Sequence, residues 1–412
     1  MPIEVRPPTE EELPEYFRTI SVGFANTQPV QDEAAQEAEA ALWELDRTHA
    51  AFDDGRIVGG TSAYSFQMAL PGGTTAPTAG VTGVAVLPTH RRQGILTRLM
   101  RSQLDEVVER GDVFAALNAS EAQIYGRFGY GPADRALAFE LATERSAFSR
   151  PPEVGGRVRL VPLEEALELI PPVYEAHRPS RPGELDRSPG WWAIVLGRVE
   201  GWKGGGPQFF AVHEDDDGAP DGYARYATDV RWAHGGLSEG TLTVRELVGT
   251  TPEVEAALWR YCCDVDLVTR LVGVSRPLDD HLPWRLADQR QLRVTSVADR
   301  LWVRLVDVAA GLAARRYGVD DELTIEVTDP FRPENDGCYR LDGGPEGASC
   351  ERTGDPPALR LDAAALGALV LGGPRFSTLA RARRVEEVAT GALTRADRMF
   401  ASARSPLCTT TF

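Results

Sequence analysis

The chain has 412 residues, enough for about three domains of ordinary size, and 42% of them are hydrophobic, as in soluble globular proteins. Its formal net charge of −17 argues against a protein that binds nucleic acid through phosphates and favours attraction of cationic small molecules, although solubility alone would explain the same acidity. There is no run of about 18 apolar residues and no N-terminal secretory signal, so we expect a cytoplasmic protein without a membrane partner.

Five cysteines and six histidines are scattered along the chain. None of their spacings is that of a metal site, and an odd number of cysteines without a secretory signal favours free thiols. We therefore expect no bound metal.

The first part of the chain predicts strands and helices in alternation. A capping box at Thr9 to Glu12 begins a helix that runs to about Phe24, and the turn Asp54-Gly55 joins a hairpin. The expected elements are a strand at 3–5, this helix, a second helix at 31–45, hairpin strands at 51–53 and 56–68, and a strand at 79–87.

Residues 81–110 carry the strongest pattern. An apolar strand ends before Pro88, a helix with apolar residues at spacings of three and four follows from Leu96, and Gly111 can cap it. Between them, the loop 91–94 (Arg-Arg-Gln-Gly) leaves backbone N–H groups without intrahelical partners at the positive end of the helix. This loop predicts a diphosphate site, and a plain connection with a solvated arginine pair is the alternative.

The first unit continues to residue 142, and a second unit then repeats its outline. A strand at 114–117, a capped turn at 118–121, the segment IYGRFGYG at 124–131 and a last strand at 135–142 come first, and a Pro- and Gly-containing stretch at 144–156 suggests a domain boundary. A hairpin at 209–213 and 222–226, a strand at 241–248 and a helix at 252–265 capped by Thr251 follow. The turn at 249–251 (Gly-Thr-Thr) has no arginine, so this second unit should lack a diphosphate site.

From residue 292 a third pattern begins. It predicts strands at 301–306, 323–327, 338–341 and 358–361, and helices at 308–316, 362–371 and 377–390, the last two capped by Asp362 and Ser377. The tail at 407–412 is apolar and β-branched, whereas most termini are polar and frayed. We therefore expect the tail to pack into the protein.

Two motifs resemble known proteins. Arg91, Gly94 and the helix after them resemble the acetyl-CoA motif Q/R-x-x-G-x-G/A of GNAT N-acetyltransferases, with Leu96 in place of the last small residue. The segments VAVLPTHRRQG at 84–94 and IYGRFGYG at 124–131 are similar to the Eis (enhanced intracellular survival) family, over the whole chain. The resemblance implies an α+β fold with mixed sheets: a catalytic GNAT domain at 1–150, a degenerate GNAT-like domain at 151–290 and a sterol-carrier-like domain at 291–412 that ends in the active-site carboxylate.

The resemblance also implies an acetyl-CoA-dependent N-acetyltransferase and a homohexamer. A primary amine of a polyamino substrate, such as an aminoglycoside antibiotic, would attack the thioester directly. Acetyl-CoA would be the cosubstrate, held by strand backbone, by the diphosphate loop and by the turn opposite. The expected contacts are Val84, Ala85, Val86, Arg91, Arg92, Gln93, Gly94, Ile95, Leu96, Thr97, Ser120 and Glu121.

By motif position, the family's general acid falls on Tyr125. A phenol with a pKa of about 10 can protonate the leaving thiolate and still be neutral at pH 7. Tyr130 is expected to be a packing residue. The family's general base falls on the α-carboxylate of Phe412, whose basicity would have to rise through burial. The simpler interpretations are two core aromatic residues and a carboxylate that only accepts a hydrogen bond.

The expected substrate pocket contains Phe24, Asn26 and Trp43. Asn26 and Thr411 stand where the family has acidic residues, which weakens the expected grip on polycations. Negative charge would be restored by four nearby residues, which otherwise form a solvated helix face: Asp32, Glu33, Glu37 and Glu39. Acetylation of peptide or protein lysines or of polyamines, and a CoA- or lipid-binding protein with weak activity, stay open as alternatives.

Overall fold

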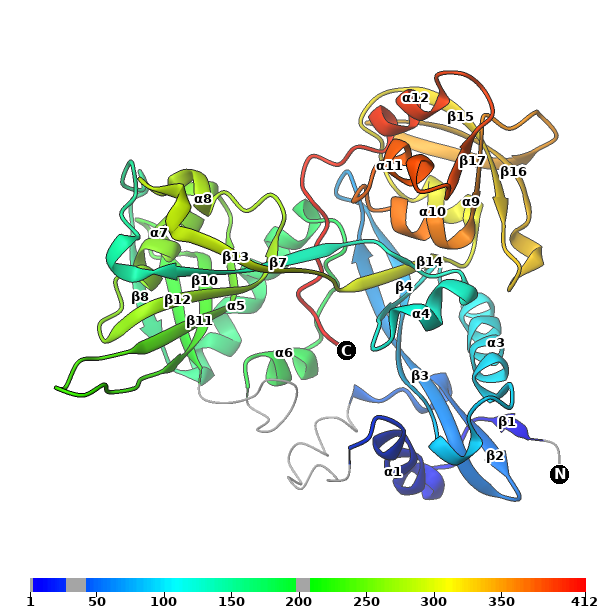
Figure 1. Ribbon diagram of the computed structural model, residues 1–412, viewed down its shortest axis with the longest axis horizontal. Helices are drawn as coiled ribbons and strands as arrows, with labels where there is room; N and C mark the ends of the chain where they lie inside the picture. Colours follow the sequence, from blue (N-terminus) through cyan, green and yellow to red (C-terminus); the bar gives the residue numbers. More distant parts are fainter. Residues whose placement is uncertain (1–2, 27–41, 198–207) are drawn as a thin grey trace.

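The computed structural model describes residues 3–26, 42–197 and 208–412. Figure 1 shows two lobes, each built on a seven-stranded sheet, and a smaller unit with a five-stranded sheet at the upper right. The predicted mixture of sheets and helices is confirmed. In the described ranges, no helix is both long and apolar enough to cross a membrane. Most of the predicted helix at 31–45, including Asp32, Glu33, Glu37 and Glu39, lies outside the described residues.

The first sheet has the strand order β1-β2-β3-β4-β5-β14-β6, and β4 and β5 form its parallel pair. The predicted capping box at Thr9 leads through a 3-10 turn (Glu10–Glu12) into α1. Helix α3 ends in a Schellman turn at Gly111, whose φ is 79°. The elements of this lobe are β1 Glu4–Arg6, α1 Leu13–Gly23, β2 Thr48–Asp53, β3 Arg56–Ala69, β4 Thr75–Val86, α3 Ile95–Glu109, β5 Phe114–Asn118, α4 Ala122–Tyr125, β6 Gly131–Pro132 and β14 Leu301–Leu305.

The second sheet repeats this order strand for strand, as β8-β9-β10-β11-β12-β7-β13, with β11 and β12 as its parallel pair. Helix α7 begins at the predicted cap, because the Thr251 hydroxyl accepts the N–H of Val254 at 3.2 Å. The elements of this lobe are β7 Arg135–Ala142, β8 Arg157–Val161, α5 Leu163–His177, α6 Pro189–Val195, β9 Phe209–Glu214, β10 Pro220–Asp229, β11 Gly240–Gly249, α7 Pro252–Cys263, β12 Val268–Pro277, α8 Leu282–Arg285 and β13 Leu292–Asp299.

The sixth strand of each sheet, β14 in the first and β7 in the second, comes from a part of the chain outside the unit in which we expected that sheet. We expected β7 to be the last strand of the first sheet, but it lies in the second sheet between β12 and β13. We expected β14 in the C-terminal unit, but it lies in the first sheet between β5 and β6. Both placements were wrong because a hydrophobic pattern marks a strand without identifying its neighbours. The chain therefore passes twice between the lobes, and the domain boundaries at 150 and 290 stay predictions.

The third sheet has the order β17-β16-β15-β18-β19, and α10 contacts β14 and β6 of the first lobe as well as β18. Asp362 caps α10 as predicted. The helix expected at 377–390 is wrong, because α11 begins after Arg375 and is much shorter. It ends in a turn where Arg383 has a left-handed backbone (φ 60°), and no glycine at that place in the sequence indicated the end of the helix. The elements are α9 Val308–Ala313, β15 Asp321–Thr328, β16 Gly337–Gly344, β17 Gly347–Thr353, β18 Leu359–Asp362, α10 Ala363–Leu369, α11 Phe376–Arg381, β19 Val385–Glu387 and α12 Ala392–Met399.

Asp134 joins both passages between the lobes to the C-terminal tail. This buried residue lies between β6 and β7. Its Oδ1 accepts the N–H groups of Arg300 (3.2 Å) and Leu301 (2.7 Å), where β13 leads into β14, and its Oδ2 accepts the N–H of Cys408 (2.8 Å). Burial raises the pKa of the Asp134 carboxyl to about 6, although the N–H donors act in the opposite direction. One side chain thus holds three segments that are far apart in sequence.

Replacing Asp134 should separate these contacts. We expect Asp134→Ala to lower the thermal unfolding midpoint clearly, because the buried N–H groups of Leu301 and Cys408 lose their acceptor at about 1–3 kcal/mol each. Asp134→Asn should cost less, because one amide oxygen can still serve Leu301 while the amide nitrogen faces Cys408. Calorimetry and hydrogen exchange at the Cys408 amide would measure both, and an unchanged midpoint in Asp134→Ala would contradict this role.

Candidate active site

The parallel strands β4 and β5 part at the centre of the first sheet. Thr78 to Gly80 pair with Phe114 to Ala116, and no further pairing joins the two strands in the part of the chain that the structure describes. A bulge follows, because β4 has two residues, Gly83 and Val84, where β3 has one. The predicted residues Val84, Ala85 and Val86 therefore lie on a strand edge that β5 does not use.

The loop 91–94 leads from the end of β4 into α3 and is exposed. Arg92 (φ 64°) and Gly94 (φ 77°) both have left-handed backbone, and Gly94 is the N-cap of α3. No side chain in the described ranges caps this helix, so the N–H groups of its first turn, from Ile95 to Thr97, have no intrahelical acceptor. Leu96 packs against the core under α3, which accounts for a large residue at this place in the motif.

A buried tyrosine lies beside the parting. Tyr125, at the end of α4, packs in the same core cluster as Val81, the first β4 residue beyond the last pair with β5. Burial raises the pKa of the Tyr125 phenol above its ordinary value, a hydrogen bond from Ser120 lowers it, and the charge of Glu121 raises it further. Tyr130 is fully buried with its ring centroid 6.2 Å from that of Tyr125, and it packs in the core as expected.

The last residue of the chain lies where β4 and β5 part. Phe412 is 4% exposed, its ring centroid is 5.3 Å from that of Phe66, and a Cβ built on Gly80 would stand 3.2 Å from its Cε2. Its N–H donates to Oδ1 of Asn118, the last residue of β5, at 3.3 Å. Figure 1 shows the tail running in red between the two lobes. The prediction that the tail packs into the protein is confirmed.

A cleft of about 470 Å³ adjoins Phe66, and its lining comes from both lobes. Tyr64, Phe66 and Trp191 form its aromatic wall, with ring centroids 5.1 to 6.2 Å apart. Phe66 also packs against Phe412, so one side chain contacts both the cleft and the tail's last residue. Its other lining residues are Leu42, Glu44, Ser65, Glu175, Arg178, Asp186, Arg187 and Ser188.

Two carboxylates of the cleft are bonded to neutral donors. Glu44 accepts the N–H of Ser65 at 2.6 Å and its hydroxyl at 2.7 Å, and Asp186 accepts the N–H of Gln67 at 2.7 Å. Glu175, by contrast, forms an ion pair with Arg178 at 2.9 Å. Glu44 and Asp186 therefore offer negative charge to a cationic ligand.

The three predicted substrate residues lie near the cleft and the strand edge rather than in one pocket. Gly23 packs so closely on Ala85 that a Cβ would come within 2.6 Å of the Ala85 side chain, and the exposed residues Phe24 and Asn26 follow it. Trp43 packs edge-on against Tyr64 at 5.8 Å, behind the cleft wall.

The cleft carboxylates and the residues that hold the tail were not predicted from the sequence. Glu44 and Asp186 are 142 positions apart by their numbers, and neither belongs to a local motif. Asn118 lies in the turn that we expected near the site. Its hydrogen bond with Phe412 could not be predicted, because it depends on how the tail packs. In the described ranges, no group of three or more His, Cys, Asp or Glu residues is arranged to hold a metal ion.

Three family models match successive parts of the chain. Residues 4–133 and residues 183–305 each match an acetyltransferase (GNAT) domain, and residues 308–409 match a sterol carrier protein domain. The second match ends with β14, the strand that completes the first sheet.

Several relatives align with the chain over nearly their whole length. The chain is 40% identical to an N-acetyltransferase of Streptomyces coelicolor and 34% identical to the N-acetyltransferase Eis of Mycobacterium tuberculosis, each over 98% of both chains. Among solved structures, Eis1 from Mycobacterium abscessus is similar over the full length of both chains, with a TM-score of 0.87 and 32% identity. A GCN5-related N-acetyltransferase from Anabaena variabilis, at 21% identity and a TM-score of 0.84, shares the fold.

Proposed function

The chain belongs to the Eis family of GNAT N-acetyltransferases, and on this premise we propose that it transfers the acetyl group of acetyl-CoA to primary amines of polyamino compounds such as aminoglycosides. One observation carries the proposal: β4 and β5 part after Gly80, and Phe412 packs against Gly80. This supports a thioester site in the opening, beside the residue whose α-carboxylate we propose as the proton acceptor.

The strand edge and the loop fit the cosubstrate. GNAT acetyltransferases use acetyl-CoA generally. The unused edge of β4 at Val84 to Val86 offers main-chain groups to the pantetheine amides and to the thioester oxygen. The exposed loop with Arg91 and Arg92, together with the uncapped first turn of α3, suits a diphosphate.

The reaction requires one proton to leave the amine and one to reach the thiolate. The amine nitrogen bonds to the thioester carbon, and the carbon–sulfur bond breaks. In our proposal the carboxylate of Phe412 takes the amine proton, directly or through water, and the phenol of Tyr125 protonates the CoA thiolate. The raised pKa of Tyr125 keeps the phenol protonated at neutral pH until that step, and solvent then reprotonates the phenolate.

The cleft supplies the acceptor site. Glu44 and Asp186 attract a polycation, and the rings of Tyr64, Phe66 and Trp191 provide an apolar wall for a sugar or aliphatic face. Two carboxylates from different lobes suit a substrate that carries several amines. They compensate in this proposal for the acidic side chains absent at Asn26 and Thr411.

The proposal is tested by following CoA release with the purified protein, acetyl-CoA and a panel of amines. We expect a multi-amine aminoglycoside to be acetylated faster than a lysine peptide or a linear polyamine, with the product mass confirming each transfer. Fastest turnover of the peptide would contradict the aminoglycoside assignment. CoA binding by calorimetry without turnover of any amine would contradict the enzyme assignment and indicate a carrier.

Removing Phe412 should lower kcat about 100-fold, because the new terminal carboxylate, on Thr411, lies one residue short and the amine loses its positioned proton acceptor. The Kd for CoA should be unchanged, since Phe412 contacts Phe66, Gly80 and Asn118, and none of these belongs to the proposed diphosphate loop. Phe412→Leu keeps the carboxylate and an apolar side chain, so it serves as the matched control and should retain most of the rate. Full activity in the truncated chain would contradict the role of the carboxylate.

Tyr125→Phe should lower kcat about 100-fold with little change in the KM for acetyl-CoA, because only the proton donor is lost. Since the phenol must carry its proton and its pKa is raised, the wild-type rate should not fall on the alkaline side until above about pH 10. Steady-state kinetics from neutral pH to about pH 11 would measure this. Tyr130→Phe, in the same core cluster, is the control and should keep the wild-type profile.

Glu44→Gln and Asp186→Asn should each raise the KM for an aminoglycoside about threefold, because each removes one charge at a partly exposed site. Added salt should raise the wild-type KM in the same direction. Glu346→Gln, an exposed change in the third unit, is the control for total charge. An equal effect of the control would mean that net charge, and not the cleft, sets the KM.

A further inference from the structure

The second sheet contains a parting like that of the first. β11 and β12 pair from Gly240 to Val244 and then separate. β11 carries one extra residue, Arg245, where the separation starts, as β4 does in the first sheet. In the first lobe, this is the place where we propose that acetyl-CoA binds.

Side chains of the protein occupy the parting in the second lobe. Arg276, on β12, donates across it to the carbonyl of Leu247 on β11 at 3.2 Å and is held by Asp280 at 2.8 Å. The turn into α7 has its cap filled by Thr251. In the described part of the second lobe, a bridged parting and a capped helix therefore stand where the first lobe has an open strand edge and an uncapped helix.

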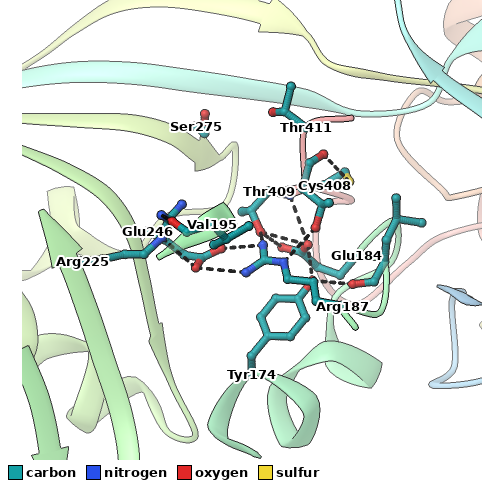
Figure 2. A network of polar contacts seen from close by, with 12 residues as sticks. Tyr174, Glu184, Arg187, Val195, Arg225, Glu246, Ser275, Cys408, Thr409 and Thr411 are labelled. Atoms are coloured by element: carbon teal, nitrogen blue, oxygen red, sulfur yellow. Dashed lines mark hydrogen bonds and ion pairs between the residues drawn. The ribbon is translucent and has the colours of Figure 1, made fainter. Parts of the chain in front are cut away.

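Arg187 connects this filled parting to the tail. Its guanidinium donates to both carboxylate oxygens of Glu246, on β11, at 3.2 and 2.8 Å, and to the hydroxyls of Thr409 at 2.8 Å and Thr410 at 2.9 Å. It also lies 4.1 Å over the ring of Tyr174. Figure 2 shows Arg187 between Glu246 and Thr409, with both charged side chains buried.

The rest of the tail is held as closely. Glu184 accepts the N–H of Thr409 at 3.1 Å and its hydroxyl at 2.9 Å. Arg300 donates to the carbonyl of Cys408 at 3.0 Å and to the hydroxyl of Thr411 at 2.9 Å. Residues from both lobes therefore hydrogen-bond to the segment that leads to Phe412. The side chains that bind Thr409 and Thr410, Glu184 and Arg187, belong to the second lobe.

We propose that the parting of the second sheet has become a socket for the tail, and that Arg187 is a positioning residue that fixes the Phe412 carboxylate through Thr409 and Thr410. This inference rests on the proposed function of that carboxylate. Two residues of extended chain reach at most about 7 Å, so a fixed Thr410 confines the carboxylate to a small region. The buried Arg187–Glu246 pair makes the anchor rigid, because neither charge can leave the other without a large desolvation cost.

Thr410→Val tests the socket, because it removes the hydroxyl that Arg187 binds and keeps the shape of the side chain. We expect kcat to fall about 10-fold with an unchanged Kd for CoA, and the unfolding midpoint to fall only modestly, because the buried Nε–H of Arg187 loses its acceptor. Added imidazole should restore part of the rate, because an external base replaces a misplaced carboxylate, which a merely structural defect would not allow. Thr243→Val, on β11 itself, is the matched control and should behave as wild type.

Arg187→Met provides the second measurement. It should lower kcat more than Thr410→Val does and show the same recovery with imidazole. Arg187 also lines the cleft, so its KM for the amine should change while that of Thr410→Val should not. Wild-type kcat in Thr410→Val, or a loss that imidazole does not restore, would overturn the socket even if removal of Phe412 abolishes the rate. Full activity without Phe412 would instead overturn the role of the carboxylate.

Discussion

The buried carboxylate of Asp134 is the constraint on which the arrangement of the lobes depends. It stands where the chain leaves the first sheet, it binds the segment by which the chain returns, and it holds the tail at Cys408. Burial raises the pKa of this carboxyl group to about 6, although its N–H donors act in the opposite direction. Asp134 fixes the relative positions of three segments. Both passages between the lobes and the tail must come together at this carboxyl group before its hydrogen bonds can form.

Local structure was readable in the sequence wherever a side chain acts on its own neighbours. Thr9, Thr251 and Asp362 cap the helices that they precede, and Gly111 ends α3, because capping involves residues only a few positions apart. The partners of β7 and β14 could not be predicted, since both strands are apolar enough for either sheet and the choice is made by contacts across the whole chain. Arg383 misled the prediction of α11 because an arginine rarely takes the left-handed conformation that ends a helix.

The candidate site divides in the same way. The loop 91–94, the strand before it and the segment around Tyr125 lie within one stretch of about fifty residues and carry a family motif, so the sequence analysis could name them. The apolar tail could be expected to pack, yet its partners Glu184, Arg187 and Arg300 lie in connecting segments with no distinguishing pattern. The charge of the cleft likewise depends on Glu44 and Asp186 meeting across two lobes, which is a property of the tertiary structure alone.

The exchange of strands also separates the order of folding from the order of synthesis. β5 emerges from the ribosome with an edge that only β14 will cover, and residues 301–305 are made after the entire second lobe. Until then the nascent first lobe carries an open strand edge, the kind of surface that recruits other chains. β7 likewise cannot pair until β12, a later part of the chain, has been synthesised. A gene cut near residue 150 would therefore yield two fragments, each without the sixth strand of its own sheet, and neither would complete that sheet as an independent module.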